Sequence, residues 1–472
     1  MKRKAISLLT AGLLAVLTGC TQAAGYEGFE KPQQPASTLV PAADTYRTDV
    51  TAYEDAGIPD KCLDTVSSGD GACVIRKMEH YYDVTLDYQH HSAAAVGSAY
   101  AEASIRAFPD YHAIVEPYVY ENIMMAFPAL TDDYTPVEER ITYLSHTLRP
   151  DQQEELFGFA ETLSGGTHGF AEDGHISYEE AVTFNLIVEA LRGTACSALS
   201  LWGEKTENGD MIASRFLDWN LGSEYQMCRL HAVIHANKGE RSYTGITFLG
   251  FNGIVSAIND DGVFAAILDV GSHDTKYTYQ NRKCYTYELR YALEEYGTAR
   301  EIGEFMVENS ASFTYSHHIY LADGKETFCA EDAVAELQKS GKGYSVLRDS
   351  QTPLLDAIHW DQPDSLCVVN SFAAEGNQDS FTGNSNNFVR FYKYNEWVGA
   401  EDKFTIGELK TALTCEQVNL GVREDEPTVD NVRWRGTSQI ILVDYHTGKM
   451  QVSFTSPEGP SDDVIFTDIG HF

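Results

Sequence analysis

The sequence predicts a protein of mixed α and β structure, in which a mainly helical segment precedes a strand-rich one. Apolar residues recur at helical spacing between residues 150 and 193, where Ser177 and Glu180 form the S-x-x-E pattern of a capping box. From residue 194 to residue 269 the apolar residues mostly alternate, as in strands that bury one face. Two helical stretches and further strand hairpins follow. The predicted fold class is therefore α+β.

The N-terminus resembles a bacterial lipoprotein signal peptide, residues 1–19. Basic residues at positions 2–4 precede an apolar run, residues 5–17. This run is shorter than a typical membrane-spanning helix. The run ends in Leu-Thr-Gly-Cys, which resembles the lipobox, where the leader is cut before Cys20 and a diacylglycerol is attached to its sulfur. Acyl chains contribute about 0.8 kcal/mol per buried CH₂. We expect a lipid-anchored protein of the bacterial cell envelope, outside the cytoplasmic membrane; simple secretion is the alternative.

The composition bounds the remaining possibilities. Residues 20–48 contain Pro32, Pro35 and Pro41 among small and polar residues, which predicts a flexible linker above the bilayer. The 472 residues carry a formal charge of −36 and are 43% apolar, which predicts a large core and an acidic surface. Because such a surface repels nucleic acid, we expect no nucleic-acid partner.

The cysteines and histidines indicate neither a structural zinc site nor a cofactor. Apart from Cys20 and the candidate nucleophile Cys196, seven cysteines remain, an odd number that cannot all pair: Cys62, Cys73, Cys228, Cys284, Cys329, Cys367 and Cys415. Cys62 and Cys73 flank a Ser-Gly-Asp-Gly turn and form the expected disulfide, and no C-x-x-C pair occurs. The neighbouring histidines at 90–91 and 317–318 would point to opposite faces of a strand, so neither pair makes a metal clamp by itself.

The segment before Cys196, residues 49–195, is expected to be mainly helical. An Ala-rich helical stretch is expected to end at Pro109. Another helix is expected to begin at Pro150 and to end at Gly165 and Gly166. A third helix begins at the Ser177 capping box. Gly193 would end it just before Cys196.

The stretch 193–220 contains the most informative pattern. Two alternating runs are joined by a polar turn over residues 204–210, which predicts a β-hairpin. The hairpin would bring Cys196 close to Arg215 and Asp218. A cysteine thiol needs a nearby cation and an orienting group to act as a nucleophile at neutral pH.

This hairpin resembles the start of the mature chain in Ntn hydrolases of the choloylglycine hydrolase, acid ceramidase and penicillin acyltransferase group. The family pattern is Cys-small-small, a turn, then Gly-Arg-x-x-Asp-Trp; here Ser214 stands in place of the Gly. The resemblance implies an αββα four-layer sandwich and self-cleavage between Ala195 and Cys196. Residues 49–195 would then be an α chain or pro-segment, and residues 196–472 the catalytic β chain.

Two downstream residues complete the site that the resemblance implies. Residues 367–372 resemble a family strand whose Asn donates to the oxyanion, and this role falls on Asn370. A second family Arg corresponds to Arg390, with an alternative alignment on Asn387. Residues 254–269 resemble the segment that lines the acyl pocket, but Asp269 stands where bile-salt hydrolases have Asn.

The implied reaction is hydrolysis of a non-peptide C–N bond in a small acyl amide, through a thioester on Cys196. The α-amine that self-cleavage frees on Cys196 would be the general base, since its unperturbed pKa is roughly 7.7–8.0. Arg215 would stabilise negative charge, and Asp218 would orient the amine and the thiol. Neither cofactor nor metal is implied, and acyl transfer to another amine is open by the same intermediate.

Two other functions fit parts of the sequence. Cys-Ser-Ala-Leu at residues 196–199 is similar to phospholipase-B-like proteins of the same fold, although Arg215 and Asp218 favour an amidase. A non-catalytic lipoprotein that binds ligands at the cell surface is the other alternative. The acyl and amine specificity and the oligomeric state are left open by the sequence.

Overall fold

The computed structural model describes residues 52–131, 133–191, 194–270, 277–382, 384–414, 437–459 and 464–472. The predicted signal peptide, the lipidation site Cys20 and the linker therefore lie outside the described residues. Within these ranges, no helix combines the length and the apolar character needed to cross a bilayer.

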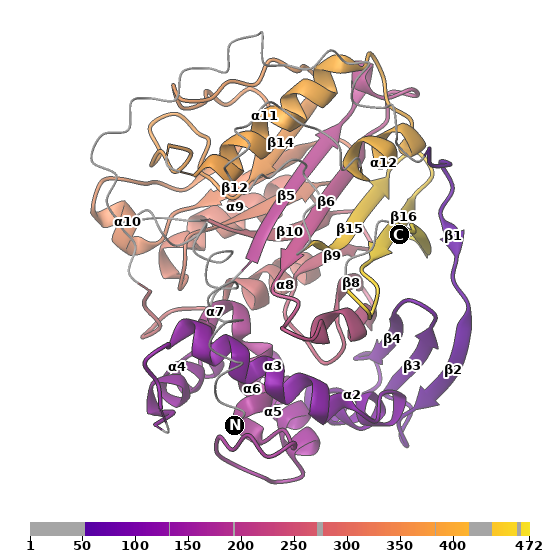
Figure 1. Cartoon of the computed structure of the whole chain (residues 1–472), viewed down its shortest axis with the longest axis vertical. Coiled ribbons are helices and arrows are strands. Elements are labelled where there is room, and N and C mark those ends of the chain that lie inside the picture. Colours follow the sequence, from indigo (N-terminus) through magenta and orange to yellow (C-terminus); the bar gives the residue numbers. More distant parts are fainter. Residues whose placement is uncertain are drawn as a thin grey trace, which may run out of the picture.

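Two sheets packed face to face form the centre of the molecule (Figure 1). The seven-stranded sheet has the order β1 (Ile58–Pro59), β17 (Thr467–His471), β16 (Lys449–Phe454), β15 (Thr437–Asp444), β6 (Ile212–Trp219), β5 (Thr194–Leu201) and β14 (Ser365–Val369). The ten-stranded sheet has the order β13 (Val346–Arg348), β12 (Thr327–Asp332), β11 (His317–Ala322), β10 (Phe264–Asp269), β9 (Ser256–Asn259), β8 (Tyr243–Phe248), β7 (His231–Asn237), β4 (Tyr82–Asp87), β3 (Cys73–Met78) and β2 (Cys62–Ser67). Between the sheets, the Ser200 hydroxyl of β5 meets the Tyr320 hydroxyl of β11 at 2.5 Å.

Helices cover the outer face of each sheet. On the seven-stranded sheet, outward-facing residues of β5, β6 and β15 form a separate apolar core with α11 (Ser385–Ala400) and α12 (Ile406–Thr414). On the ten-stranded sheet, α8 (Tyr285–Glu295) and α9 (Ala299–Asn309) pack over β9 to β12, and the short α10 (Ala335–Lys339) follows β12. This order of layers confirms the predicted αββα sandwich.

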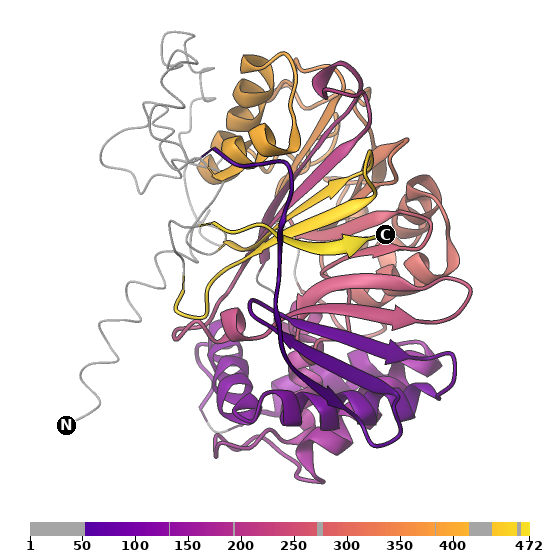
Figure 2. The same cartoon turned by 90° about the vertical axis from the view of Figure 1, so that its right-hand side faces the viewer.

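The segment before Cys196 forms a helical subassembly beneath the sheets (Figure 2). Its helices are α2 (Ala93–Ala107), α3 (Tyr111–Ala126), α4 (Thr135–Ser145), α5 (Pro150–Ser164), α6 (Tyr178–Asn185) and α7 (Ile187–Leu191). As predicted, the Ser177 capping box is present, α5 begins at Pro150 and the helix stops at Gly165, which is its C-cap residue and has the left-handed conformation. The third predicted helix is split in two, because Leu186 leaves the helical conformation between α6 and α7.

The same segment also contributes strands, which the sequence pattern did not predict. We expected residues 49–195 to be mainly helical, but β1 to β4 are strands and the helices begin at α2. β4 pairs in parallel with β7, from Tyr82 opposite Ala232 to Asp87 opposite Asn237. The first part of the chain therefore belongs to the central ten-stranded sheet.

Residues 53–59 run as an extended strap along the side of the molecule (Figure 2). The buried Lys410 ammonium of α12 donates to the carbonyl oxygens of Glu54, Asp55 and Ala56 at 2.8, 3.1 and 3.2 Å. Beyond this point, β1 pairs in parallel with β17. The strap therefore links α12 and the edge of the seven-stranded sheet to the start of the ten-stranded one.

The predicted disulfide between Cys62 and Cys73 is wrong. Both cysteines are free thiols, Cys62 exposed and Cys73 buried. Cys62 lies opposite Met78 at the open end of the β2–β3 hairpin, whereas Cys73 immediately follows the turn. At about 3.3 Å per residue along a strand, the two sulfurs lie at opposite ends of the hairpin, well beyond the reach of a bridge.

Candidate active site

The predicted hairpin is present and sets the register of the site. β5 and β6 pair antiparallel, with Ala195 opposite Asp218 and Cys196 opposite Leu217. Alternation along β5 turns the Cys196 side chain toward the ten-stranded sheet, while Leu199 faces α11 and α12. The Cys196 side chain is completely buried.

Arg215 provides the cation beside the Cys196 sulfur. Its Nη2 donates to the Cys196 Sγ at 3.3 Å and to the Ile267 carbonyl oxygen of β10 at 2.8 Å. The side chain is fully buried, and its Nε and Nη1 have no hydrogen-bond partner among the described residues. Burial lowers the pKa of Arg215, and the neighbouring Cys196 and Asp218 partly oppose this shift. The guanidinium therefore has two unused donors next to the candidate nucleophile.

Arg390 reaches the same cysteine from the opposite side of the sheet. It lies on α11, and its Nη1 donates to the Cys196 carbonyl oxygen at 2.7 Å. Its Nη2 donates to the Oδ1 atoms of Asn370 and Asn387, each at 2.7 Å. The two alignments left open by the sequence thus fall on contacting residues, of which Arg390 touches Cys196.

Asn370 follows β14 and holds the Cys196 nitrogen. Its Oδ1 accepts the Cys196 N–H at 2.8 Å, and its Nδ2 donates to the Asp269 carbonyl oxygen at 2.6 Å. These partners fix the orientation of the amide, because Oδ1 faces donors and Nδ2 faces an acceptor. Donation to an oxyanion stays a prediction, since Nδ2 is already engaged by Asp269.

Asp218 lies beside the peptide bond that precedes Cys196. Its Oδ1 accepts the Thr437 hydroxyl at 2.6 Å, and its Oδ2 lies 3.7 Å from Arg390 Nη1. Burial raises the pKa of Asp218, opposed by Arg390, Thr437 and Arg215. A buried carboxyl with a raised pKa beside two cations is suited to exchange a proton during the reaction.

The thiol itself is neutral at physiological pH in the uncut chain. Burial raises the pKa of Cys196 to about 11, the Arg215 charge lowers it in part, and the Asp218 charge raises it further. A cation alone therefore does not create a standing thiolate here. Catalysis needs a base that removes the proton during attack.

The sequence reasoning missed Thr437. It lies opposite Asp218 where β15 pairs with β6, next to a register irregularity in that pairing. The hairpin that contains it was interpreted as purely structural. No local motif marks Thr437, because its partner lies 219 residues away in the sequence.

Two clusters among the described residues could hold a metal ion by the distances between their ligand atoms: His318 with Cys329 and Glu331, and Asp60 with Glu79 and His80. In the first, Glu331 already accepts hydrogen bonds from Arg348, two backbone amides and Asn377. The Arg348 cation and the saturated carboxylate make this cluster a poor cation site. In the second, Asp60 accepts the His80 backbone amide and contacts its ring nitrogen.

Comparisons with known proteins give the following likenesses. No protein-family model matches the chain. No curated protein matches it either. Among solved structures, a Caenorhabditis elegans ortholog of N-acylethanolamine-hydrolyzing acid amidase matches with a TM-score of 0.34 and 13% identity, over 57% of this chain and 95% of that chain. A mutant conjugated bile acid hydrolase from Clostridium perfringens matches with a TM-score of 0.34 and 13% identity, over 58% and 92%.

Penicillin V acylase from Agrobacterium tumefaciens matches with a TM-score of 0.31 and 12% identity, over 58% of this chain and 86% of that chain. At this level of similarity no residue role is carried over. The residue roles proposed below therefore rest on the contacts within this chain.

Proposed function

We propose that this chain is an amidohydrolase that cuts itself between Ala195 and Cys196 and then cleaves small acyl amides through a Cys196 thioester. One observation carries the proposal: every polar atom of Cys196 has a side-chain partner from a different element. Arg215 holds the sulfur, Asn370 the nitrogen and Arg390 the carbonyl oxygen. A structural cysteine in a strand needs no such set, because its backbone groups pair within the sheet.

Self-cleavage begins with attack of the Cys196 sulfur on the Ala195 carbonyl carbon. The C–N bond between the two residues breaks as the new C–S bond forms, and the thiol proton passes to the departing nitrogen. The acyl shift frees the α-amine of Cys196, and water then cleaves the thioester, which leaves a carboxylate on Ala195 and restores the Cys196 thiol. For the relay of the thiol proton we propose Asp218, which lies opposite Ala195 in the β5–β6 pairing.

In the mature enzyme the new α-amine acts as the base for its own thiol. Asn370 Oδ1, which accepts the Cys196 N–H in the intact chain, would orient that amine. The sulfur then attacks the substrate carbonyl, the amine product leaves, and water releases the acyl group. The unused N–H groups of Arg215 would contact the negative charge that develops on the reacting atoms.

The two segments are expected to stay together after cleavage. The β4–β7 pairing and the Lys410 bonds to the strap both join residues before Cys196 to residues after it. Separation would break a central sheet, which cutting one peptide bond does not require. The mature protein would therefore be a complex of residues 20–195 and 196–472.

Attachment to the outer side of the membrane through a lipidated Cys20 belongs to the same proposal. The sequence ending Leu-Thr-Gly-Cys supports it. N-terminal sequencing and mass analysis of the purified protein test this part separately, because they report both the Cys20 and the Cys196 ends.

Intact-mass analysis of wild type and the Cys196→Ala variant tests the self-cleavage. Wild type should yield the two fragments and Cys196→Ala a single chain. Cys228→Ala is the matched control, since Cys228 is also buried but is not among the contacts of the site. An uncut wild type with full amidase activity would refute the proposal.

A substrate panel tests the reaction class. N-acyl amino acids and related acyl amides should be cleaved, and phospholipids should not. A thiol-directed acyl probe should label Cys196 in the mature enzyme and fail to label Cys196→Ser. Turnover of phospholipids alone would favour the phospholipase-B-like alternative, and absence of probe labelling would favour a non-catalytic binding protein.

A further inference from the structure

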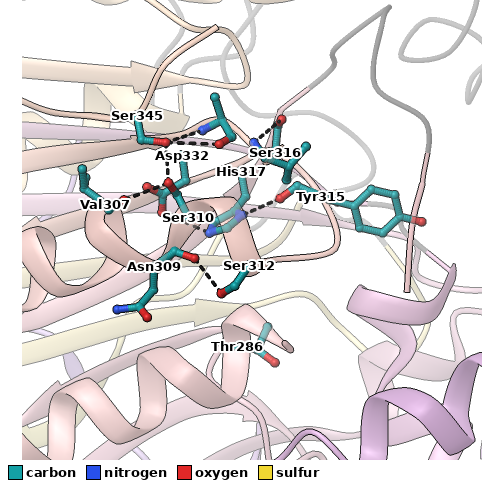
Figure 3. A network of polar contacts seen from close by, with 12 residues as sticks. Thr286, Val307, Asn309, Ser310, Ser312, Tyr315, Ser316, His317, Asp332 and Ser345 are labelled. Atoms are coloured by element: carbon teal, nitrogen blue, oxygen red, sulfur yellow. Dashed lines mark hydrogen bonds and ion pairs between the residues drawn. The ribbon is translucent and has the colours of Figure 1, made fainter. Parts of the chain in front are cut away.

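The short helix α7 carries a buried carboxylate to which the proposed chemistry assigns no role. Glu189 Oε1 accepts the backbone N–H of Thr286 at 3.0 Å and its hydroxyl at 2.6 Å. Thr286 lies in the first turn of α8 (Figure 3). The N-cap residue of this helix, Cys284, makes no side-chain capping bond. Glu189 thus caps α8 from a different segment of the chain, where a carboxylate is favoured by the helix dipole.

Asn185, at the end of α6, makes a second bridge. Its Oδ1 accepts the Asn252 N–H at 2.9 Å, and its Nδ2 donates to the Gly250 carbonyl oxygen at 3.0 Å. Both partners lie in the loop between β8 and β9. This loop has a constrained shape, because Gly250 has a φ of +82° and a Cβ there would come within 1.9 Å of the Tyr111 hydroxyl.

Both bridges join residues just before the proposed cleavage site to elements that follow it. A third contact supports the same stretch: Arg140 of α4 donates to the Ala190 carbonyl oxygen at 2.8 Å, with its guanidinium 4.1 Å from the Tyr277 ring centroid. Asn370 and Arg390 hold the chain at Cys196 itself. Contacts therefore hold the described residues on both sides of positions 192–193, namely Asn185 to Ala190 before them and Cys196 after them.

We propose that Glu189 and Asn185 are positioning residues for self-cleavage. They hold the end of α7 against α8 and the β8–β9 loop, so that the Ala195 carbonyl stays in reach of the Cys196 sulfur. This inference rests on the proposed self-cleavage and adds residues that touch neither reacting atom. A displacement of about 1 Å at a reacting centre can cost on the order of 10²-fold in rate.

The chemistry of Glu189 makes the test specific. A single oxygen accepts both bonds, while Oε2 has no hydrogen-bond partner among the described residues. Burial raises the pKa of Glu189 to about 7, opposed by the Thr286 hydrogen bonds and by the His317 imidazole. His317 in turn contacts the Tyr315 carbonyl and Asp332 (Figure 3). A neutral glutamine can therefore keep the acceptor that Thr286 uses.

Self-cleavage of newly made protein is followed by intact mass over time, with the folded fraction measured by circular dichroism. Glu189→Ala should slow cleavage on the order of 10²-fold, and Glu189→Gln should restore it to within roughly tenfold of wild type. Once cut, each variant should show wild-type turnover per Cys196 titrated with the acyl probe. A merely structural role would lower turnover and cleavage together.

Glu116→Ala is the matched control. Glu116 is also a buried carboxylate that accepts backbone amides, but its partners Asp173, Gly174 and His175 all lie in the segment before Cys196. This variant should be less stable than wild type, but its folded fraction should cleave itself at the wild-type rate. If Glu189→Ala does not fold, the Thr286→Val variant tests the positioning role instead. It removes only the hydroxyl donor and should slow self-cleavage. Thr286→Ser should restore the wild-type rate of self-cleavage.

The outcomes separate the two proposals. A wild-type chain that stays uncut overturns the proposed self-cleavage itself. A wild-type chain that cuts, together with Glu189→Ala or Thr286→Val variants that cut equally fast, overturns only the positioning role.

Discussion

Two fully buried arginines on neighbouring parts of the molecule have opposite surroundings. Behind the ten-stranded sheet, Arg290 contacts Glu155 at 2.7 Å and Glu294 at 3.1 Å. Between the sheets, Arg215 has a thiol and a carbonyl oxygen as partners, and two of its guanidinium nitrogens have none among the described residues. Burial lowers the pKa of both, but at Arg290 the nearby acidic groups prevail and hold its pKa well above the usual value.

From this difference we interpret the Arg290 charge as structural and the Arg215 charge as one that serves the reaction. Arg290 is neutralised, so its desolvation is largely offset by carboxylates that are buried with it. Arg215 is left under-neutralised beside Cys196, whose nitrogen, oxygen and sulfur all have side-chain partners. An unused buried donor costs stability. Such a donor is therefore expected where a bound or developing negative charge completes the site during the reaction.

The largest expected effect is on folding, at Arg290. Arg290→Met leaves the buried Glu155 carboxylate without its cation, which should cost about 3–5 kcal/mol of unfolding free energy. Urea denaturation measures the loss. The double variant Arg290→Met with Glu155→Leu should recover much of it, and a double variant as unstable as the single one would show that the ion pair is not the cause.

Arg215→Met should show the converse pattern. Turnover per molecule of folded enzyme should fall on the order of 10²–10³-fold, because the charge beside the reacting atoms is lost. The unfolding free energy should stay the same or rise, since none of the carboxylates in the described part of the chain forms an ion pair with Arg215, and an apolar side chain needs no partner. Kinetics and urea denaturation on the same preparation test both halves. A destabilisation equal to that of Arg290→Met would break the comparison.

Thr437→Val sharpens the comparison on the carboxylate side of the site. The Thr437 hydroxyl stabilises the ionised form of Asp218, whose pKa burial already raises. Losing that donor should raise the pKa further, so less Asp218 is ionised at a given acidic pH. The acidic limb of kcat/KM should then move to higher pH. Thr437→Ser should leave the acidic limb where it is in wild type. An acidic limb that does not move in Thr437→Val would show that Asp218 is not the group that sets it.

The smallest effect is expected at Cys62, which belongs to neither region. Because Cys62 is an exposed free thiol, Cys62→Ser should change the unfolding free energy by less than about 0.5 kcal/mol. Alkylation of the unfolded protein without reductant should label Cys62 in wild type. A loss of about 2–4 kcal/mol of unfolding free energy, together with resistance of Cys62 to alkylation, would show that the disulfide predicted from the sequence is present.

Local patterns predicted the parts of the site that are close in the sequence. The alternation on both sides of the turn placed Cys196, Arg215 and Asp218 on paired strands, and register followed from the hairpin itself. The Ser177 capping box and Pro150 predicted helix starts for the same reason. Asn370 and Arg390 came from resemblance, and the structure brings both to Cys196.

Long-range pairing produced the differences. β3 and β4 are strands because β7 offers them a sheet to join, a partner more than a hundred residues away. The Thr437 contact to Asp218, the two bonds of Glu189 to Thr286 and the Lys410 bonds to the strap are of the same kind. The expected Cys62–Cys73 disulfide failed because a strand hairpin separates residues that are near in sequence.

The sequence by itself determined the starts of the helices at Pro150 and Ser177, the β5–β6 hairpin and the identity of the candidate nucleophile, because these depend on periodicity, turn residues and short spacing. The tertiary structure decided which buried charges have a partner of opposite charge and which do not. It matched Arg290 with Glu155 and left Arg215 with unused donors beside Cys196. The reason is physical: the effect of a buried charge depends on which groups are desolvated with it, and sheet packing brings those groups from distant parts of the chain.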